Sequence, residues 1–205
     1  MKAVFFDFDG VLTTDKTGTT SVCNYIGSKT GMSPSAFGAV YSQYNAQLSN
    51  GRLTHRDVWD DICTKLNKNI PYDLLFESFI HTPIDNDMLS VLKQIKSIGL
   101  KTGMITDNKL DRVDAIIAYY NWYSLFDTVV VSADIGSGKR NKDIFDIACS
   151  KAAVKPDECI FIDNKRENLL IPEKMGMKTF LYDDALRDIG SLIMWLRNLG
   201  IEISL

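Results

Sequence analysis

The 205-residue sequence has no long apolar run, and this absence excludes a membrane-spanning helix, which needs about 20 consecutive apolar residues. The start, MKAVFFDFDG, carries two acids and no apolar h-region, so we expect no signal peptide and a cytoplasmic protein. Long Gly, Ser or Pro tracts and internal repeats are also missing, which excludes a disordered or fibrous chain.

Cysteine is scarce and widely spaced. The four cysteines form no CxxC pair, so neither a structural zinc site nor a compact disulfide framework is indicated, and we expect reduced, buried thiols. The net charge is −3 and no dense Lys/Arg stripe is present, which excludes the basic footprint of a nucleic-acid or membrane-surface protein. A small-molecule partner is therefore expected. The cysteines are Cys23, Cys63, Cys149 and Cys159.

Short apolar runs recur along the chain, each largely β-branched or aromatic and uninterrupted. Such runs are typical of strands buried on both faces of a parallel sheet. The predicted strands are Ala3–Phe6, Thr102–Ile105, Val129–Val131, Ile160–Ile162 and Thr179–Leu181.

Amphipathic stretches separate these runs. The spacing predicts helices over Asp85–Ile98, with Gly99 as the C-terminal cap, over Asn141–Ala152, and over Ala185–Leu199, whose apolar face begins at Leu186. The alternation of strands and helices predicts an α/β fold with a doubly wound, Rossmann-like parallel sheet as its core.

The interval from residue 13 to residue 81 breaks this alternation, because its pattern predicts only helices. We expect a small helical cap over 13–81, inserted into a core formed by 1–12 and 82–205. One cap helix is predicted to start at Thr54, with Asp57 completing an acidic variant of the capping box. Because ligands bind at the carboxyl ends of strands in open α/β sheets, the cap is placed to act as a lid.

Asp7 and Asp9 flank Phe8 directly after the first apolar run. Residues two apart in an extended chain point the same way, so both carboxylates project from the carboxyl end of the first strand. Two like charges this close become tolerable when a cation binds between them or one is protonated, and Mg²⁺ prefers carboxylate and carbonyl oxygen. Gly10 permits a tight turn. For DFDG alone, a polar turn without function is the alternative interpretation.

At these residues the sequence resembles the haloacid dehalogenase-like (HAD) hydrolase superfamily, whose first motif is a hydrophobic strand followed by Asp-x-Asp-x-Val/Thr, as in VFFDFDGVLT. Three further motifs follow in order. GMITDN supplies Thr106, for which capping of a helix near Lys109 is an alternative role. SADIGSGKRNKDIFDIA supplies Lys139, with Lys142 as an alternative because the family's usual prolines are absent. CIFIDNKREN supplies Asp163. The resemblance spans nearly the whole chain.

The resemblance implies a role for each matched residue. Asp7 would be the nucleophile that forms an aspartyl-phosphate, and Asp9 the general acid/base. Mg²⁺ would be bound by Asp7, the backbone carbonyl of Asp9, and Asp163. Thr106 and Lys139 would hold the phosphoryl oxygens.

Some positions depart from the family pattern, and one narrows the choice of reaction within the family. Asp9 favours phosphoester chemistry over dehalogenation, because a departing halide needs no proton. Asn164 stands where a second acid is common, so weaker metal binding or a non-catalytic binding protein is an alternative. Asp107 and Asn108 are candidate substrate neighbours, although an acid beside a bound phosphate repels it unless it turns away or meets a cation.

The cap and the phrase NGRLTHRDVWDDI resemble the sugar-phosphatase branch of the family. Hydrolysis of a small phosphomonoester, such as a sugar phosphate, by a monomer or homodimer is therefore the leading hypothesis, with a phosphomutase as the alternative of the same chemistry. Candidate specificity residues in the cap are Arg52, in an NGR loop, and His55. Helical spacing places the aromatic candidates on apolar helix faces that pack into a core, which is the better interpretation for Tyr41, Tyr44 and Trp59. His81 is assigned to the hinge segment that returns from the cap to the core. Neither histidine has a sequence neighbour that indicates catalysis.

Overall fold

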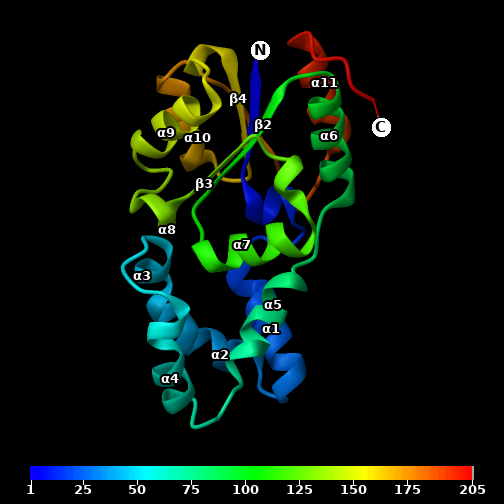
Figure 1. The fold of residues 1–205 in the computed structure, drawn as a ribbon. Coiled ribbons are helices and arrows are strands. Elements are labelled where there is room, and N and C mark those ends of the chain that lie inside the picture. The colour runs from blue at the N-terminus through cyan, green and yellow to red at the C-terminus, as the bar shows by residue number, and fades with distance from the viewer. Residues whose placement is uncertain (205) are drawn as a thin grey trace.

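A five-stranded parallel sheet forms the centre of the fold, in the order β3-β2-β1-β4-β5 (Figure 1). The computed structural model describes residues 1–204. Every predicted strand is present and extends at most one residue further at either end, because the flanking residues also pair in the ladder. The strands are β1 Ala3–Phe6, β2 Lys101–Thr106, β3 Thr128–Val131, β4 Cys159–Asp163 and β5 Lys178–Leu181.

Helices cover both faces of the sheet, which confirms the doubly wound α/β core. Helices α9 and α10 pack on one face, and α6 and α11 lie on the other (Figure 1). Side chains of β1 alternate between the two layers: Phe5 joins the cluster under α9, whereas Val4 and Phe6 join the cluster under α6. The core helices are α6 Asn86–Ser97, α7 Leu110–Tyr119, α8 Ser132–Ile135, α9 Asp143–Ala152, α10 Arg166–Lys174 and α11 Ile189–Asn198.

Two predicted helix starts are wrong. Helix α11 begins at Ile189 rather than Ala185, because Arg187 adopts a φ of 50° and Asp188 caps the helix by accepting a hydrogen bond from the Ser191 N–H. Leu186, assigned to the apolar face, is 77% exposed. Helix α9 begins two residues later than predicted. Both helices otherwise bury their predicted apolar faces.

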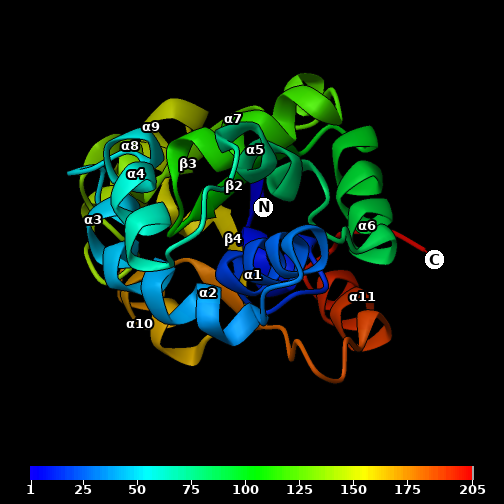
Figure 2. The same cartoon turned by 90° about the horizontal axis from the view of Figure 1, so that it is seen from below.

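The residues between β1 and α6 form a helical layer beyond the carboxyl edge of the sheet, and Figure 2 shows it from below. The chain leaves and re-enters the core side by side, where Thr13 bridges Ile84. The capping box of Thr54 and Asp57 at the start of α4 is confirmed. The division into a core and a cap remains a prediction, and Leu205 lies outside the described residues. The layer contains α1 Gly18–Thr30, α2 Pro34–Tyr41, α3 Asn45–Ser49, α4 His55–Lys65 and α5 Tyr72–Ile80.

A buried hydrogen-bond chain joins this helical layer to the core. His55, which is fully buried, directs Nδ1 to the carboxylate of Asp111 on α7 at 2.7 Å and Nε2 to the Tyr41 hydroxyl at 2.7 Å. A carboxylate only accepts, so Nδ1 carries the proton toward Asp111, and in the neutral ring Nε2 accepts from Tyr41. Burial raises the pKa of Tyr41 and keeps its hydroxyl protonated. His55 therefore has the acidic partner that its sequence neighbours did not indicate.

Tyr41→Phe should lower the free energy of unfolding by about 1–3 kcal/mol, because His55 Nε2 would stay buried without a partner. Urea denaturation measures this change. The matched control is Tyr44→Phe, which removes a hydroxyl bonded to Asp61 at the surface and should change stability by less than about 0.5 kcal/mol. Equal effects for the two variants would contradict the role assigned to the buried chain.

None of the helices within residues 1–204 has the length and hydropathy that a bilayer crossing needs.

Candidate active site

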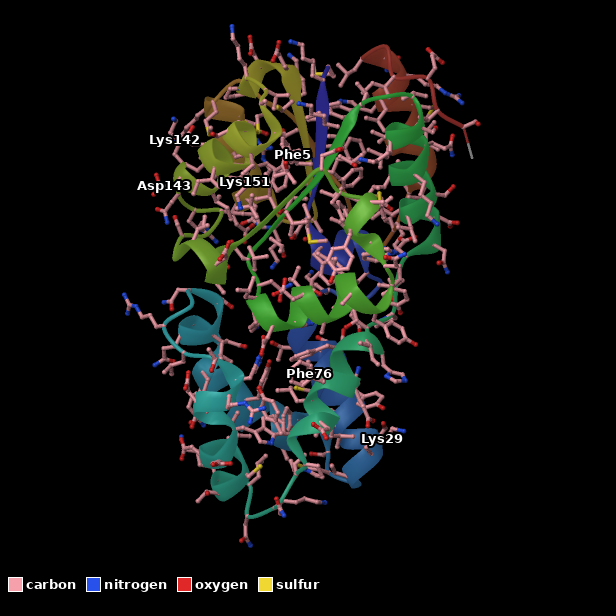
Figure 3. All side chains as sticks on the ribbon, viewed as in Figure 1. Phe5, Lys29, Phe76, Lys142, Asp143 and Lys151 are labelled. Carbon is pink, nitrogen blue, oxygen red and sulfur yellow. The ribbon has the colours of Figure 1, made fainter. Side chains whose placement is uncertain are left out.

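The predicted motif residues converge at the carboxyl edge of the sheet. Asp7 follows β1 and Asp163 ends β4, the neighbouring strand. Lys139 reaches in from the loop between α8 and α9 and places Nζ 2.7 Å from Asp7 Oδ1 and 2.6 Å from Asp163 Oδ2. All three side chains are buried. The alternative lysine, Lys142, is wrong for this position, because it lies on the outer surface at the start of α9 (Figure 3) and pairs with Asp146.

Charge in this cluster is not balanced by the protein alone. Two carboxylates face one ammonium group. Burial and the charge of Asp163 raise the pKa of Asp7 to about 7, against the opposing effect of Lys139. The pKa of Lys139 is raised, because its attraction to Asp7 and Asp163 outweighs the cost of burial. The cluster is therefore suited to binding a further cation.

The oxygen-rich composition of the cluster fits Mg²⁺. Among residues 1–204 no three His, Cys, Asp or Glu side chains come together as a metal site, so two carboxylates would need backbone carbonyl and water oxygens to complete the coordination. One observation favours this: Asn164 Oδ1 is buried beside Asp163 and has no hydrogen-bond partner within the described chain. A buried acceptor of this kind is satisfied by a metal-bound water.

Asn164 is held by an acid from another part of the chain. Its Nδ2 donates to Asp184 Oδ2 at 2.8 Å, and Asp184 follows the end of β5. Gly10 makes this arrangement possible, because a Cβ at that position would lie 2.2 Å from Asn164 Nδ2. The carboxylate of Asp184 thus brings negative charge next to the position where the family pattern has a second acid.

Asp184→Asn should weaken Mg²⁺ binding about 10-fold or more, as loss of an acid that orients a metal shell does. Isothermal titration calorimetry with MgCl2 measures the dissociation constant. Asp157→Asn, an exposed position remote from the cluster, makes the same change in net charge and should leave it unaltered. An equal loss in both variants would mean that Asp184 acts only through overall charge.

Asp9 is held by a buried arginine that the sequence motifs did not reveal. Arg112 on α7 is 1% exposed and forms a two-point ion pair with Asp9, at 2.9 Å and 3.0 Å. Asn108 donates to the same carboxylate at 2.9 Å. Gly18 leaves room for the guanidinium, which a Cβ there would approach to 2.5 Å. In the sequence, the only feature that could have indicated this ion pair is the position of Arg112 beside Val113 on the apolar face of a helix.

The remaining predicted residues surround a small cavity of about 80 Å³ that Asp7 and Asp9 line. Thr106, at the end of β2, lines it, and its alternative role as a helix cap is wrong because α7 has Lys109 as its N-cap residue. Asp107 turns its carboxylate to the backbone N–H of Lys139 at 2.9 Å.

The surroundings of this cavity favour an anion. Its lining has four lysines against the three carboxylates of Asp7, Asp9 and Asp107, and it includes the start of α1, where helix N–H groups and the helix dipole attract negative charge. The lysines are Lys16, Lys109, Lys139 and Lys165. The Asn108 amide is committed to Asp9 and Thr106, so Asn108 orients the acid rather than facing open space.

The cap candidates lie away from this cavity. Arg52 is exposed, and Tyr41 and Trp59 are buried in the hydrophobic cluster, as the stripe interpretation predicts. Tyr44 packs partly buried against that cluster. His81 is exposed and hydrogen-bonds the Glu77 carbonyl.

Lys109 is the residue of this region with the least support from protein groups. It is 9% exposed, yet its ammonium group makes no hydrogen bond or ion pair with any residue in the described part of the chain. Burial and the nearby Arg112 lower its pKa to about 8.

Lys109→Met should therefore stabilise the protein at pH 7. The folded-state pKa of about 8 lies below the ordinary 10.5, so charged Lys109 costs stability below pH 8, and the cost disappears as the pH rises from 8 to 10.5. A gain of up to about 3 kcal/mol is expected at pH 7, smaller at pH 9.5, in urea denaturation. The exposed Lys151→Met serves as control. Destabilisation by Lys109→Met at pH 7 would contradict an unpaired ammonium.

The strand order and the helices on both faces of the sheet define an α/β protein with a Rossmann-like core, and its acidic cluster lies at the carboxyl edge. The sequence profile of the haloacid dehalogenase-like hydrolases matches residues 1–170. The chain belongs to that family, as its motifs predict.

Individual relatives are distant. Rat bifunctional epoxide hydrolase 2 is 27% identical over 162 residues, which cover 70% of this chain and 29% of the relative. A glyceraldehyde 3-phosphate phosphatase of Methanocaldococcus jannaschii is 26% identical over 92 residues, covering 44% and 40%. The chain thus spans less than half of either relative's length. A HAD family enzyme from Bacteroides thetaiotaomicron, in complex with magnesium and inorganic phosphate, has a TM-score of 0.71 at 17% identity, over 94% of this chain and 98% of its own. At this identity the likeness concerns the fold.

Proposed function

We propose that this hydrolase is a Mg²⁺-dependent phosphatase that cleaves a small phosphomonoester, such as a sugar phosphate, through an aspartyl-phosphate intermediate. The observation that carries the proposal is the buried contact of Lys139 with both Asp7 and Asp163 beside an anion-attracting cavity. It brings a nucleophile, a cation and a second carboxylate within reach of one phosphoryl group.

The reaction proceeds in two displacements. In the first, a carboxylate oxygen of Asp7 bonds to phosphorus, the bond from phosphorus to the ester oxygen breaks, and Asp9 gives its proton to the leaving alkoxide. In the second, Asp9 takes a proton from water as the water oxygen bonds to phosphorus, the acyl-phosphate bond breaks, and inorganic phosphate and free Asp7 result.

Arg112 and Asn108 hold the carboxylate of Asp9 in place. Their donors bind the ionised carboxylate, which is the form that acts as base on water in the second displacement. Asp9 must carry a proton in the first displacement, so the approach of the substrate has to loosen this ion pair. Arg112 is accordingly a positioning residue that sets the orientation of Asp9.

Binding groups supply the remaining stabilisation. Lys139, Thr106 and the first N–H groups of α1 hold the phosphoryl oxygens, where negative charge is spread in the transition state. Mg²⁺, held by Asp7, the Asp9 carbonyl and Asp163, would offset the repulsion between the nucleophile and the phosphoryl group.

The relatives support this choice of reaction. Three curated relatives are phosphatases by name, two glyceraldehyde 3-phosphate phosphatases and one sesquiterpene phosphatase, and the structure of the Bacteroides enzyme is a complex with magnesium and inorganic phosphate. Asp9, the proton donor, favours phosphoester cleavage over dehalogenation. A cytoplasmic location and a monomeric or homodimeric state remain predictions from the sequence.

Release of inorganic phosphate from p-nitrophenyl phosphate and a panel of phosphorylated metabolites tests the proposal. Asp7→Asn should abolish turnover, and Asp9→Asn should lower kcat about 10²- to 10⁴-fold. Lys139→Met should inactivate the enzyme, whereas the surface control Lys142→Met should retain wild-type rates. Activity that survives Asp7→Asn, or no turnover on any substrate, would refute the proposal. Isomerised phosphosugar without free phosphate would indicate a phosphomutase instead.

A further inference from the structure

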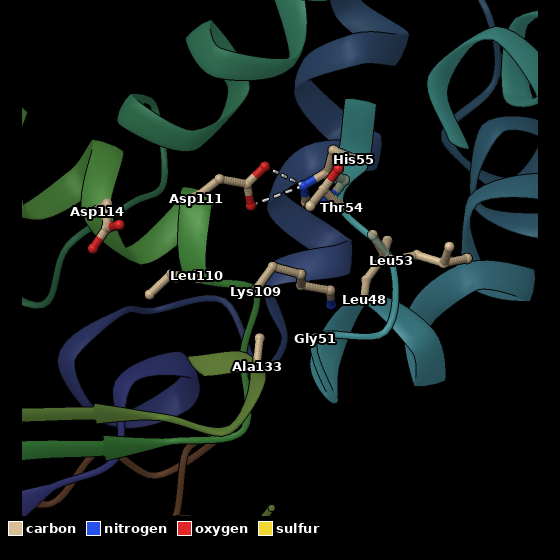
Figure 4. Close-up of a pocket in the computed structure, with 10 residues that line it drawn as sticks. All are labelled: Leu48, Gly51, Leu53, Thr54, His55, Lys109, Leu110, Asp111, Asp114 and Ala133. Carbon is tan, nitrogen blue, oxygen red and sulfur yellow. Dashed lines mark hydrogen bonds and ion pairs between the residues drawn. The ribbon is translucent and has the colours of Figure 1, made fainter. Parts of the chain in front are cut away.

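A second cavity lies between the helical cap and the core, next to the phosphate-binding cavity. It has a volume of about 250 Å³ (Figure 4). Leucine side chains from α3, the loop before α4 and the start of α7 form its apolar walls, and Asp111 and Asp114 of α7 line it as well. Because a water occupies about 30 Å³ of liquid, the space suits a compact ligand rather than an extended one.

Among residues 1–204, Lys109 alone lines both cavities. Figure 4 shows its side chain extended toward Leu48 and Gly51 of the cap. The nearest aromatic face, that of Tyr41, lies 6.0 Å from its Nζ, too far for more than a weak cation–π contact. A buried ammonium that makes no hydrogen bond costs stability, so its retention calls for a partner outside the protein chain.

We propose that Lys109 is a specificity-determining residue that donates a hydrogen bond to an uncharged oxygen of the substrate's leaving group, which occupies the second cavity. The inference rests on the proposed phosphatase function, since it requires the phosphoryl group in the first cavity and the leaving group on the other side of Lys109, which lines both cavities.

The charges around the second cavity favour a hydroxyl or carbonyl oxygen over a carboxylate. Lys109 brings one positive charge, and Asp111 and Asp114 bring two negative ones, of which Asp111 is paired with His55. Partial desolvation, with further contributions from Asp134 and Asp111, raises the pKa of Asp114 although the residue as a whole is exposed, so added negative charge is disfavoured there. A hydroxylated group satisfies both sides, because it accepts from Lys109 and donates to Asp114.

Calorimetric binding in the Asp7→Asn background tests this without turnover. The probes, with Mg²⁺ present, are inorganic phosphate, phenyl phosphate, glycerol 3-phosphate and 3-phosphoglycerate. Lys109→Met removes one positive charge from the first cavity for every probe, but it should weaken binding of glycerol 3-phosphate at least 10-fold more than binding of inorganic phosphate or phenyl phosphate. Of these three probes only glycerol 3-phosphate offers a leaving-group hydroxyl. Lys165→Met, at the rim of the first cavity, should weaken all four probes by a similar factor.

Each other outcome overturns the inference in a recognisable way. Equal weakening of all four probes by Lys109→Met would assign Lys109 to the phosphoryl group. No weakening of any probe would remove it from the site, and tighter binding of 3-phosphoglycerate than of glycerol 3-phosphate would make the preferred group an anion. These results do not depend on hydrolysis: probe binding by a wild-type protein that releases no phosphate would refute the phosphatase proposal alone.

Discussion

The contact of Lys139 with Asp7 and Asp163 is the constraint on which the arrangement of the site depends. It requires that β1 and β4 be neighbours, that both end at the same level, and that the loop after α8 fold back across them. The register of the sheet supplies the first two conditions, since Phe6 lies opposite Ile162, so that Asp7 and Asp163 follow at the same edge. Asp107, through the Lys139 N–H, fixes the loop.

Charges are concentrated at this edge at a cost to stability. Desolvation penalises each buried ion, and a buried pair repays that cost only when its geometry and hydrogen bonds are good. Asp163 meets this condition: it accepts bonds from Lys139, the Lys165 N–H and the Asn168 amide. Lys109 does not meet it, because its buried ammonium group has no such partner within the described chain, although it lines the same cavity as Asp7. The contrast separates groups that the protein itself neutralises from a group that only a ligand can satisfy.

Features local in sequence were predictable, and those formed between distant segments were not. Apolar runs marked the five strands, and residues directly after them, such as Asp7 and Thr106, lie at the edge where parallel strands place them. The pairing of Asp9 with Arg112 spans 103 residues, and that of His55 with Asp111 spans 56. The sequence around Arg112 does not indicate its partner, because the pairing depends on how α7 packs between the helical layer and the sheet. The late start of α11 also depends on a distant contact, from Arg187 to Asp85.

Asn164 shows how a local departure from a motif is offset by the fold. Read alone, an amide where an acid is common removes charge from a metal site. In the folded chain the amide points its nitrogen to Asp184, in the loop after the adjacent strand β5, and this fixes the orientation of the amide with its oxygen as the free acceptor. Asp184 therefore supplies negative charge near the cluster, in contact with the residue that occupies the position of the missing acid. Lys16, which precedes the first helix of the helical layer, pairs with Asp184 at 3.6 Å. The acid that orients Asn164 is therefore also contacted by the segment that leads from β1 into the helical layer.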